Sequence, residues 1–189
     1  MKIRRGSGLL EPCHAANRPE SGHPLLAMLA TRKSCMDLFD ELKKLITRLD
    51  EEKIEYALCG GLAMAVYALP RATLDIDILI ESSSLGNTTR AVHELGFTLS
   101  AMPMQFHGGK IDIHRVSKIE SGTGETLGLD LLIVTPDIRQ AWESRTKVEW
   151  EGGTLSVVSP RGLILLKSFR SSGQDQDDIR YLRSIIDED

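Results

Sequence analysis

The stretch that decides the fold is Leu58–Leu79, which reads LCGGLAMAVYALPRATLDIDIL. An apolar segment ends in Gly60–Gly61, an alanine-rich run follows and stops at Pro70, and aspartates then alternate with aliphatic residues. This order predicts a strand, a glycine turn, a short helix and a second strand. Paired glycines between a strand and a helix let the backbone approach a ligand closely, and the free N–H groups of a helix N-terminus suit phosphate.

The second predicted strand carries two aspartates, Asp75 and Asp77. Residues i and i+2 of a strand point to the same face, so these carboxylates are expected side by side, where they repel one another. A bound Mg²⁺ offsets that repulsion, because hard cations take oxygen ligands. The alternating aliphatic residues are expected to form the opposite, core-facing side of the strand: Leu74, Ile76, Ile78 and Ile80.

A third carboxylate, Asp130, interrupts the apolar run Leu127–Val134. A carboxylate in such a run is costly unless it is paired or bound to metal. If this segment forms a strand beside the one that carries Asp75 and Asp77, all three carboxylates converge. Asp112, in Lys-Ile-Asp-Ile-His, competes for the third place, and we favour Asp130 because its neighbours are more uniformly apolar.

The rest of the chain predicts an α/β (α+β) fold in which helices flank a mixed sheet. The expected helices lie at residues 37–49, 62–69, 88–95, 136–145, 160–169 and from Asp175 or Asp178 onward. The expected strands lie at residues 56–59, 74–81, 97–99, 110–119, 126–134, 147–151 and 154–158.

Composition and charge narrow the function classes. Residues 1–35 carry a net charge of +4 without sustained periodicity and predict a disordered tail, whereas residues 36–189 carry −8 and predict one folded domain. An acidic body is not expected of a non-specific nucleic-acid binder. No apolar run is long enough to span a bilayer and no signal-peptide pattern is present, so we expect a cytoplasmic protein. The cysteines are few and scattered, which argues against a disulfide framework or a structural zinc site.

Together, Gly60, Gly61, Asp75, Asp77 and Asp130 resemble the signature of the nucleotidyltransferase superfamily that has the polymerase-beta-like fold. Arg71-Ala-Thr-Leu-Asp-Ile-Asp is most similar to small bacterial members, which include toxin–antitoxin proteins. The resemblance covers about residues 37–189 and includes Lys167, then Arg170, then Asp175-x-x-Asp178-Ile. One departure is Gly61, where many active members have serine.

The resemblance implies transfer of an NMP from an NTP to an acceptor hydroxyl. One Mg²⁺ would bridge Asp75 and Asp77 and carry the triphosphate, and a second, held also by Asp130, would activate the acceptor. Gly60 and Gly61 would approach the phosphates, and Lys167 and Arg170, expected on one helix face, would neutralise their charge. The acceptor is open between tRNA, protein and a small molecule such as an aminoglycoside.

The alternative that the resemblance leaves open is a nucleotide-binding interaction protein, one half of a toxin–antitoxin pair, that does not catalyse transfer. Its cognate toxin or antitoxin would then be its partner. The three carboxylates Asp75, Asp77 and Asp130 favour the enzyme, because simple nucleotide binding does not require all of them.

Overall fold

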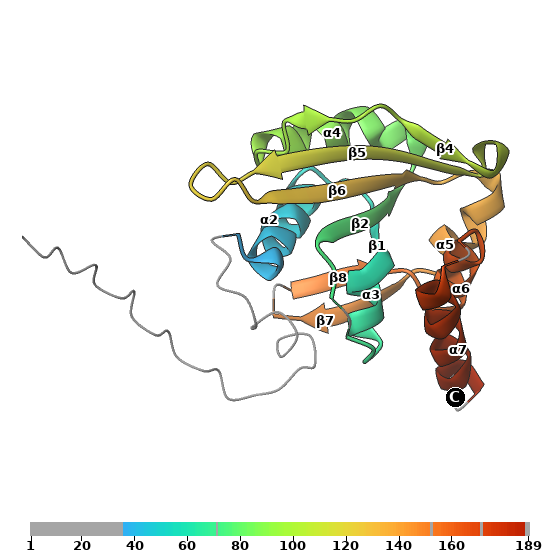
Figure 1. Ribbon diagram of the computed structural model, residues 1–189. Helices are drawn as coiled ribbons and strands as arrows, with labels where there is room; N and C mark the ends of the chain where they lie inside the picture. The colour runs from blue at the N-terminus through green and yellow to red at the C-terminus, as the bar shows by residue number, and fades with distance from the viewer. Residues whose placement is uncertain (1–35, 71, 152, 171, 188–189) are drawn as a thin grey trace, which may run out of the picture.

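The computed structural model describes residues 36–187 with gaps at 71, 152 and 171 (Figure 1). The tail predicted for residues 1–35 lies outside the described residues. One mixed sheet organises the described part, with the strand order β3-β5-β6-β2-β1-β8-β7 and β4 paired to β5. Its strands are β1 (Ala57–Leu58), β2 (Asp75–Ile80), β3 (Leu99–Ser100), β4 (Met104–Phe106), β5 (Ile111–Ile119), β6 (Thr126–Ile133), β7 (Thr146–Trp150) and β8 (Gly153–Val157).

Helices form where the sequence supplies apolar periodicity and caps. Asp37 caps α2 through its side chain, and Ser159 caps α6 with proline at the next position. The α-helices are α2 (Leu38–Glu51), α3 (Gly60–Val66), α4 (Leu85–Glu94), α5 (Arg139–Glu143), α6 (Pro160–Ser168) and α7 (Gly173–Asp187). In Figure 1, α6 and α7 lie side by side, away from α2 and α4. Among the described residues, none of the helices combines the length and the hydrophobicity that a membrane span needs.

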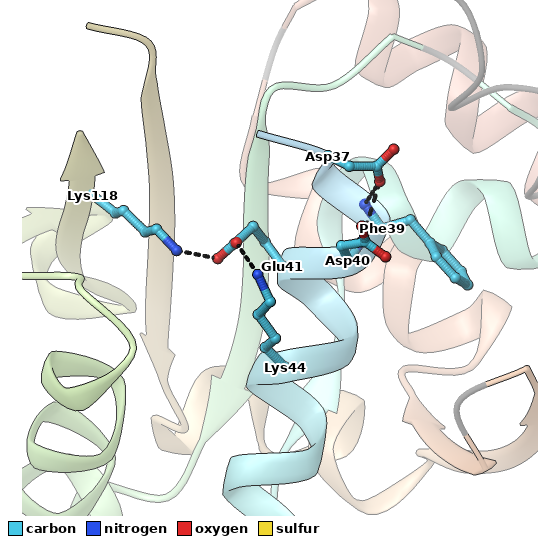
Figure 2. Close-up of polar contacts among 6 residues, drawn as sticks. All are labelled: Asp37, Phe39, Asp40, Glu41, Lys44 and Lys118. Carbon is cyan, nitrogen blue, oxygen red and sulfur yellow. Dashed lines mark hydrogen bonds and ion pairs between the residues drawn. The ribbon is translucent and has the colours of Figure 1, made fainter. Parts of the chain in front are cut away.

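The core lies between the central strands and the helices. Ile76, Ile78 and Ile80 of β2 are buried, as the alternation in the sequence predicts. On this face of the sheet, α2 is joined to β5 by a buried carboxylate, Glu41, which accepts hydrogen bonds from Lys118 and Lys44 (Figure 2). The opposite face is therefore the one that remains for a site.

The predicted fold class is confirmed. Helices flank a mixed central sheet, and two C-terminal helices follow the last strand. One detail of β2 is wrong, because Leu74 precedes the strand and is 71% exposed instead of packing on the core. The short strand β4 was not predicted, since its three residues sit in an exposed sequence without alternation.

Candidate functional site

The predicted carboxylates meet because β2 and β6 are parallel neighbours. Their register places Asp77 directly opposite Asp130, and Asp75 opposite Gly128. In the antiparallel pair on the other side of β6, Asp130 lies opposite Arg115 of β5. Residues in register on neighbouring strands share a face. Arg115, Asp130 and Asp77 thus form one row across three strands, with Asp75 one step away.

Two glycines make room for the aspartates. A Cβ atom on Gly60 would lie 2.0 Å from Oδ2 of Asp77, and one on Gly128 would lie 2.4 Å from Oδ1 of Asp75. Gly60 also has a φ of 63°, in the left-handed region that favours glycine. The glycine that begins α3 is therefore needed first by Asp77 itself, whatever ligand it also approaches.

The carboxylates crowd one another in a poorly solvated place. Asp130 is only 4% exposed. Burial, together with the charges of Asp130 and Asp75, raises the pKa of Asp77 to about 6. This is the electrostatic pattern of a site that gains from a bound cation.

One cation already stands in the row. Arg115 donates from Nε to Oδ1 of Asp130 at 2.6 Å and from a terminal nitrogen to Oδ2 at 2.7 Å, a bidentate pair. The same terminal nitrogen lies 3.5 Å from Asp75. These hydrogen bonds with Asp130 raise the pKa of Arg115. Arg115 is not among the predicted site residues; its position three residues after Asp112, on a strand predicted to neighbour that of Asp130, was the available signal.

The three carboxylates are suitable ligands for a divalent cation, but Arg115 occupies the oxygens of one of them. Three carboxylates on one face of adjacent strands are the oxygen ligands that Mg²⁺ takes. Yet the described residues contain no cluster of three or more His, Cys, Asp or Glu side chains already gathered to hold a metal ion. Both oxygens of Asp130 are engaged by Arg115. Asp75 and Asp77 would hold the metal, and Asp130 would join them once Arg115 releases an oxygen.

A pocket of about 320 Å³ opens beside the carboxylates. Its floor continues from Asp77 and Asp130 over β5 and β4, and its other wall comes from α6. Among the lining residues, the ring of His107 lies 5.7 Å from that of Phe169, and His107 Nε2 is 2.5 Å from the Phe169 carbonyl oxygen. Most lining residues are apolar, among them Met104, Phe106, Ile113, Leu132, Leu163 and Leu166.

Lys167 and Arg170 both line this pocket, but they differ in environment. Lys167 is 4% exposed, and its Nζ lies 2.6 Å from Asp178 and 3.3 Å from Asp175 of α7. Arg170 follows the C-cap of α6, so Lys167 and Arg170 do not share a helix face. This contradicts the prediction from the sequence. Arg170 is exposed, and in the described part of the chain it forms no ion pair. Its charge lowers the pKa of Asp77, although burial and Asp130 outweigh that effect.

The competing carboxylate, Asp112, lies outside the row. It stands three residues before Arg115 on β5, and so faces the other side of the sheet. There it is 3.6 Å from His114 and accepts from Gln105 at 3.4 Å. Cys59 lines the pocket, but burial raises its thiol pKa well above the ordinary value, so it is not a reactive thiolate.

Comparison with solved structures identifies the fold that carries this site. No family model and no curated protein matches the sequence. Among solved structures, the antibiotic-resistance factor ANT(2'')-Ia matches with a TM-score of 0.53 at 16% identity over 80% of this chain and 86% of that one. Its structure with adenylyl-2''-tobramycin matches with a TM-score of 0.52 at 16% identity over 77% and 87%.

A third structure, a proposed nucleotidyltransferase from Thermotoga maritima, matches with a TM-score of 0.50 at 19% identity over 80% of this chain and 93% of that one. At these identities the likeness concerns the fold. The chain therefore has the nucleotidyltransferase fold that its sequence predicts.

Proposed function

We propose that this chain is a nucleotidyltransferase that moves an NMP from Mg-NTP to an acceptor hydroxyl. The observation that carries the proposal is the register of β2 and β6, which sets Asp77 opposite Asp130 with Asp75 on the same face. Within a nucleotidyltransferase fold, this is the arrangement that two-metal phosphoryl transfer requires. Magnesium ions bound there supply charge neutralisation for the triphosphate and a lowered pKa for the attacking hydroxyl.

Each residue has a role in this proposal. Asp75 and Asp77 hold the nucleotide-bound metal, and Asp130 orients the acceptor hydroxyl and accepts its proton. Backbone groups at Gly60 and Gly61 lie against the phosphates. Arg170 and Lys167 supply positive charge, with Arg170 carrying the larger share, because two carboxylates already neutralise Lys167.

The experiment separates binding from chemistry. Total cell RNA, protein and small molecules are incubated with α-labelled NTPs, while calorimetry measures Mg²⁺-dependent NTP binding. We expect Asp77→Ala to abolish NTP binding. Asp130→Asn should lower label transfer at least ~100-fold, the scale of a lost general base, while NTP binding weakens far less. Asp112→Asn, which changes a carboxylate on the other face, is the matched control and should transfer label normally.

A second candidate function is a nucleotide-binding interaction protein that pairs with a cognate toxin or antitoxin. The bidentate hold of Arg115 on Asp130 favours it, because an engaged Asp130 cannot serve as base. Under this alternative the wild type labels nothing, whereas NTP binding still depends on Asp77. Labelling by the wild type that is lost in Asp130→Asn would decide for the enzyme.

A further inference from the structure

The two ends of the pocket beside the carboxylates differ in their chemistry. Along the sheet order, the glycine turn lies next to β1 and β2, the carboxylates stand on β2 and β6, and the apolar floor continues on β5 and β4. The proposed phosphate end and the apolar end are therefore on opposite sides of the carboxylates. The apolar end adjoins Asp130, the residue assigned to the acceptor. This position fits the acceptor of the reaction better than the triphosphate.

The walls of the pocket indicate the shape of the occupant. Ile111 and Ile113 of β5 form the floor together with Phe106 of β4, and α6 closes the other side with Leu163 and Leu166. A volume of about 320 Å³ lies at the lower end of the ~300–1,000 Å³ usual for small-molecule sites, which suits one or two rings. Phe106 lines the pocket and is 47% exposed, so its ring offers a face for stacking.

The charges of the lining exclude one class of occupant. Among the described residues that line the pocket, Asp77 and Asp130 are the only carboxylates, and both stand at the catalytic end. The remaining charged groups at that end are cationic, namely Arg115, Lys167 and Arg170. Burying an ammonium group against apolar walls without a carboxylate partner is costly. A polyamine such as tobramycin, seen in adenylylated form with ANT(2'')-Ia, would meet that cost here.

We propose that this pocket holds the acceptor, and that the acceptor is a small hydroxyl compound with a flat aromatic ring and no net positive charge. The inference rests on the proposed nucleotidyl transfer. In that step the hydroxyl oxygen forms a bond to the α-phosphorus and loses its proton to Asp130. The bond from the α-phosphorus to the bridging oxygen breaks, and pyrophosphate leaves with the electron pair.

The test is a charge series on one ring. Tyrosol is neutral, 4-hydroxyphenylacetate is anionic and tyramine is cationic, and all three carry the same phenol. Binding is measured by ligand-detected NMR on the full chain without nucleotide, with tobramycin as a fourth probe. We expect tyrosol and 4-hydroxyphenylacetate to bind, tyramine to bind at least about tenfold more weakly, and tobramycin not to bind.

Variants of residues inside and outside the pocket test whether the probes bind there. Phe106→Ala should weaken tyrosol binding by about three- to tenfold, the scale of an aromatic contact. Phe106→Glu, which adds a carboxylate at the same half-exposed place, should shift the preference toward tyramine. Met102→Ser, which removes an apolar side chain that is 85% exposed and outside the lining, is the control and should change neither.

The outcomes distinguish this inference from the proposed function. Tighter binding of tyramine or tobramycin than of tyrosol would overturn the acceptor class while leaving nucleotidyl transfer standing. Displacement of tyrosol by Mg-ATP would assign the pocket to the nucleobase and also overturn the inference. Preserved selectivity together with the absence of label transfer would instead contradict the enzyme, because the pocket would then bind its ligand without the reaction.

Discussion

At the residue scale, the site is a balance of charge around Asp130. A carboxylate buried in an apolar strand is tolerated because Arg115 pairs with both of its oxygens. The sequence predicts that Asp130 belongs to a site, because burying a carboxylate among leucines costs free energy unless the carboxylate has a partner. It does not predict which partner, because Arg115 reaches Asp130 only through the register of β5 on β6. The role of Gly128 cannot be predicted from the sequence either, because its lack of a side chain matters only once the strand pairing places Asp75 opposite it.

Replacing Arg115 tests that balance. In Arg115→Gln, Asp130 loses its counter-ion and becomes available to a metal. We expect Mn²⁺ to bind the nucleotide-free variant at least about tenfold more tightly than the wild type in calorimetry. Without metal, the variant should lose about 2 kcal/mol of unfolding free energy, because a buried carboxylate is left unpaired. Arg139→Gln, which breaks the ion pair with Glu81 near the end of β2, is the control. Weaker Mn²⁺ binding in Arg115→Gln would mean that Arg115 organises the metal site instead of competing with it.

Gly60 allows a second test at this scale. In Gly60→Ala, the new Cβ would collide with the Asp77 carboxylate, and the backbone would keep an unfavourable φ. We expect a loss of at least about 2 kcal/mol in urea unfolding, with Mg-NTP binding lost in the protein that still folds. Gly86→Ala in α4, where a Cβ meets nothing within 4 Å, should be neutral or slightly stabilising. Equal stability of the two variants would show that the turn relaxes without cost.

At the scale of the elements, periodicity predicts most of the fold. The amphipathic α2, the capped α6 and the β7–β8 hairpin appear close to their predicted bounds. The failures are short or exposed pieces: β4 has three residues, and Arg170 falls beyond the helix that was expected to carry it. Such pieces are placed by their tertiary neighbours and leave little pattern in the sequence. The contact between α2 and β5 is of the same kind, since Glu41 and Lys118 are far apart in the chain (Figure 2).

That contact predicts a pH-dependent stability. Burial alone would raise the pKa of Glu41, but the hydrogen bonds from Lys118 and Lys44 outweigh it and lower the pKa below the ordinary value for a glutamate. An acid with a lowered folded pKa stabilises the protein above its unfolded pKa and loses that contribution as the pH falls through the folded pKa. Glu41→Gln should therefore cost about 1–2 kcal/mol at pH 7, and this cost should shrink as the pH falls through the lowered pKa of Glu41.

Urea unfolding of both proteins at several pH values checks this expectation. Asp40→Asn, which changes an exposed carboxylate at the neighbouring position of α2, is the control. A cost of Glu41→Gln that is the same at pH 3 and pH 7 would show that packing, not charge, holds α2 on the sheet.

At the scale of the whole molecule, the site lies between a sheet and a helical wall. The sheet supplies the carboxylates, and α6 supplies the opposite side of the pocket. The position of α6 depends on α7, because Lys167 of α6 is buried between Asp175 and Asp178 of α7. Sequence alone marks these three residues as a pattern and suggests a role at the phosphates for Lys167. It does not show that the same ammonium joins the two helices.

Lys167 and Arg170 therefore make contrasting predictions. Lys167→Met removes the ammonium that pairs with two buried carboxylates and should lower the unfolding free energy by about 3–5 kcal/mol. Replacing Asp175 and Asp178 by asparagine in the same protein removes those charges and should recover most of the loss. Arg170→Gln, which changes an exposed side chain without an ion pair in the described residues, should leave unfolding within about 0.5 kcal/mol of the wild type and weaken Mg-NTP binding about tenfold.

The folded triple variant then isolates what Lys167 does for the nucleotide. Because its ammonium is already neutralised by Asp178 at 2.6 Å and Asp175 at 3.3 Å, its removal should weaken Mg-NTP binding less than Arg170→Gln does. Calorimetry on the triple variant and on Arg170→Gln, under conditions where urea melts show both to be folded, makes the comparison. If the triple variant loses more affinity than Arg170→Gln, then Lys167 leaves its carboxylates to meet the triphosphate. The helical wall would in that case move when nucleotide binds, since the ion pairs that join α6 to α7 would have to break.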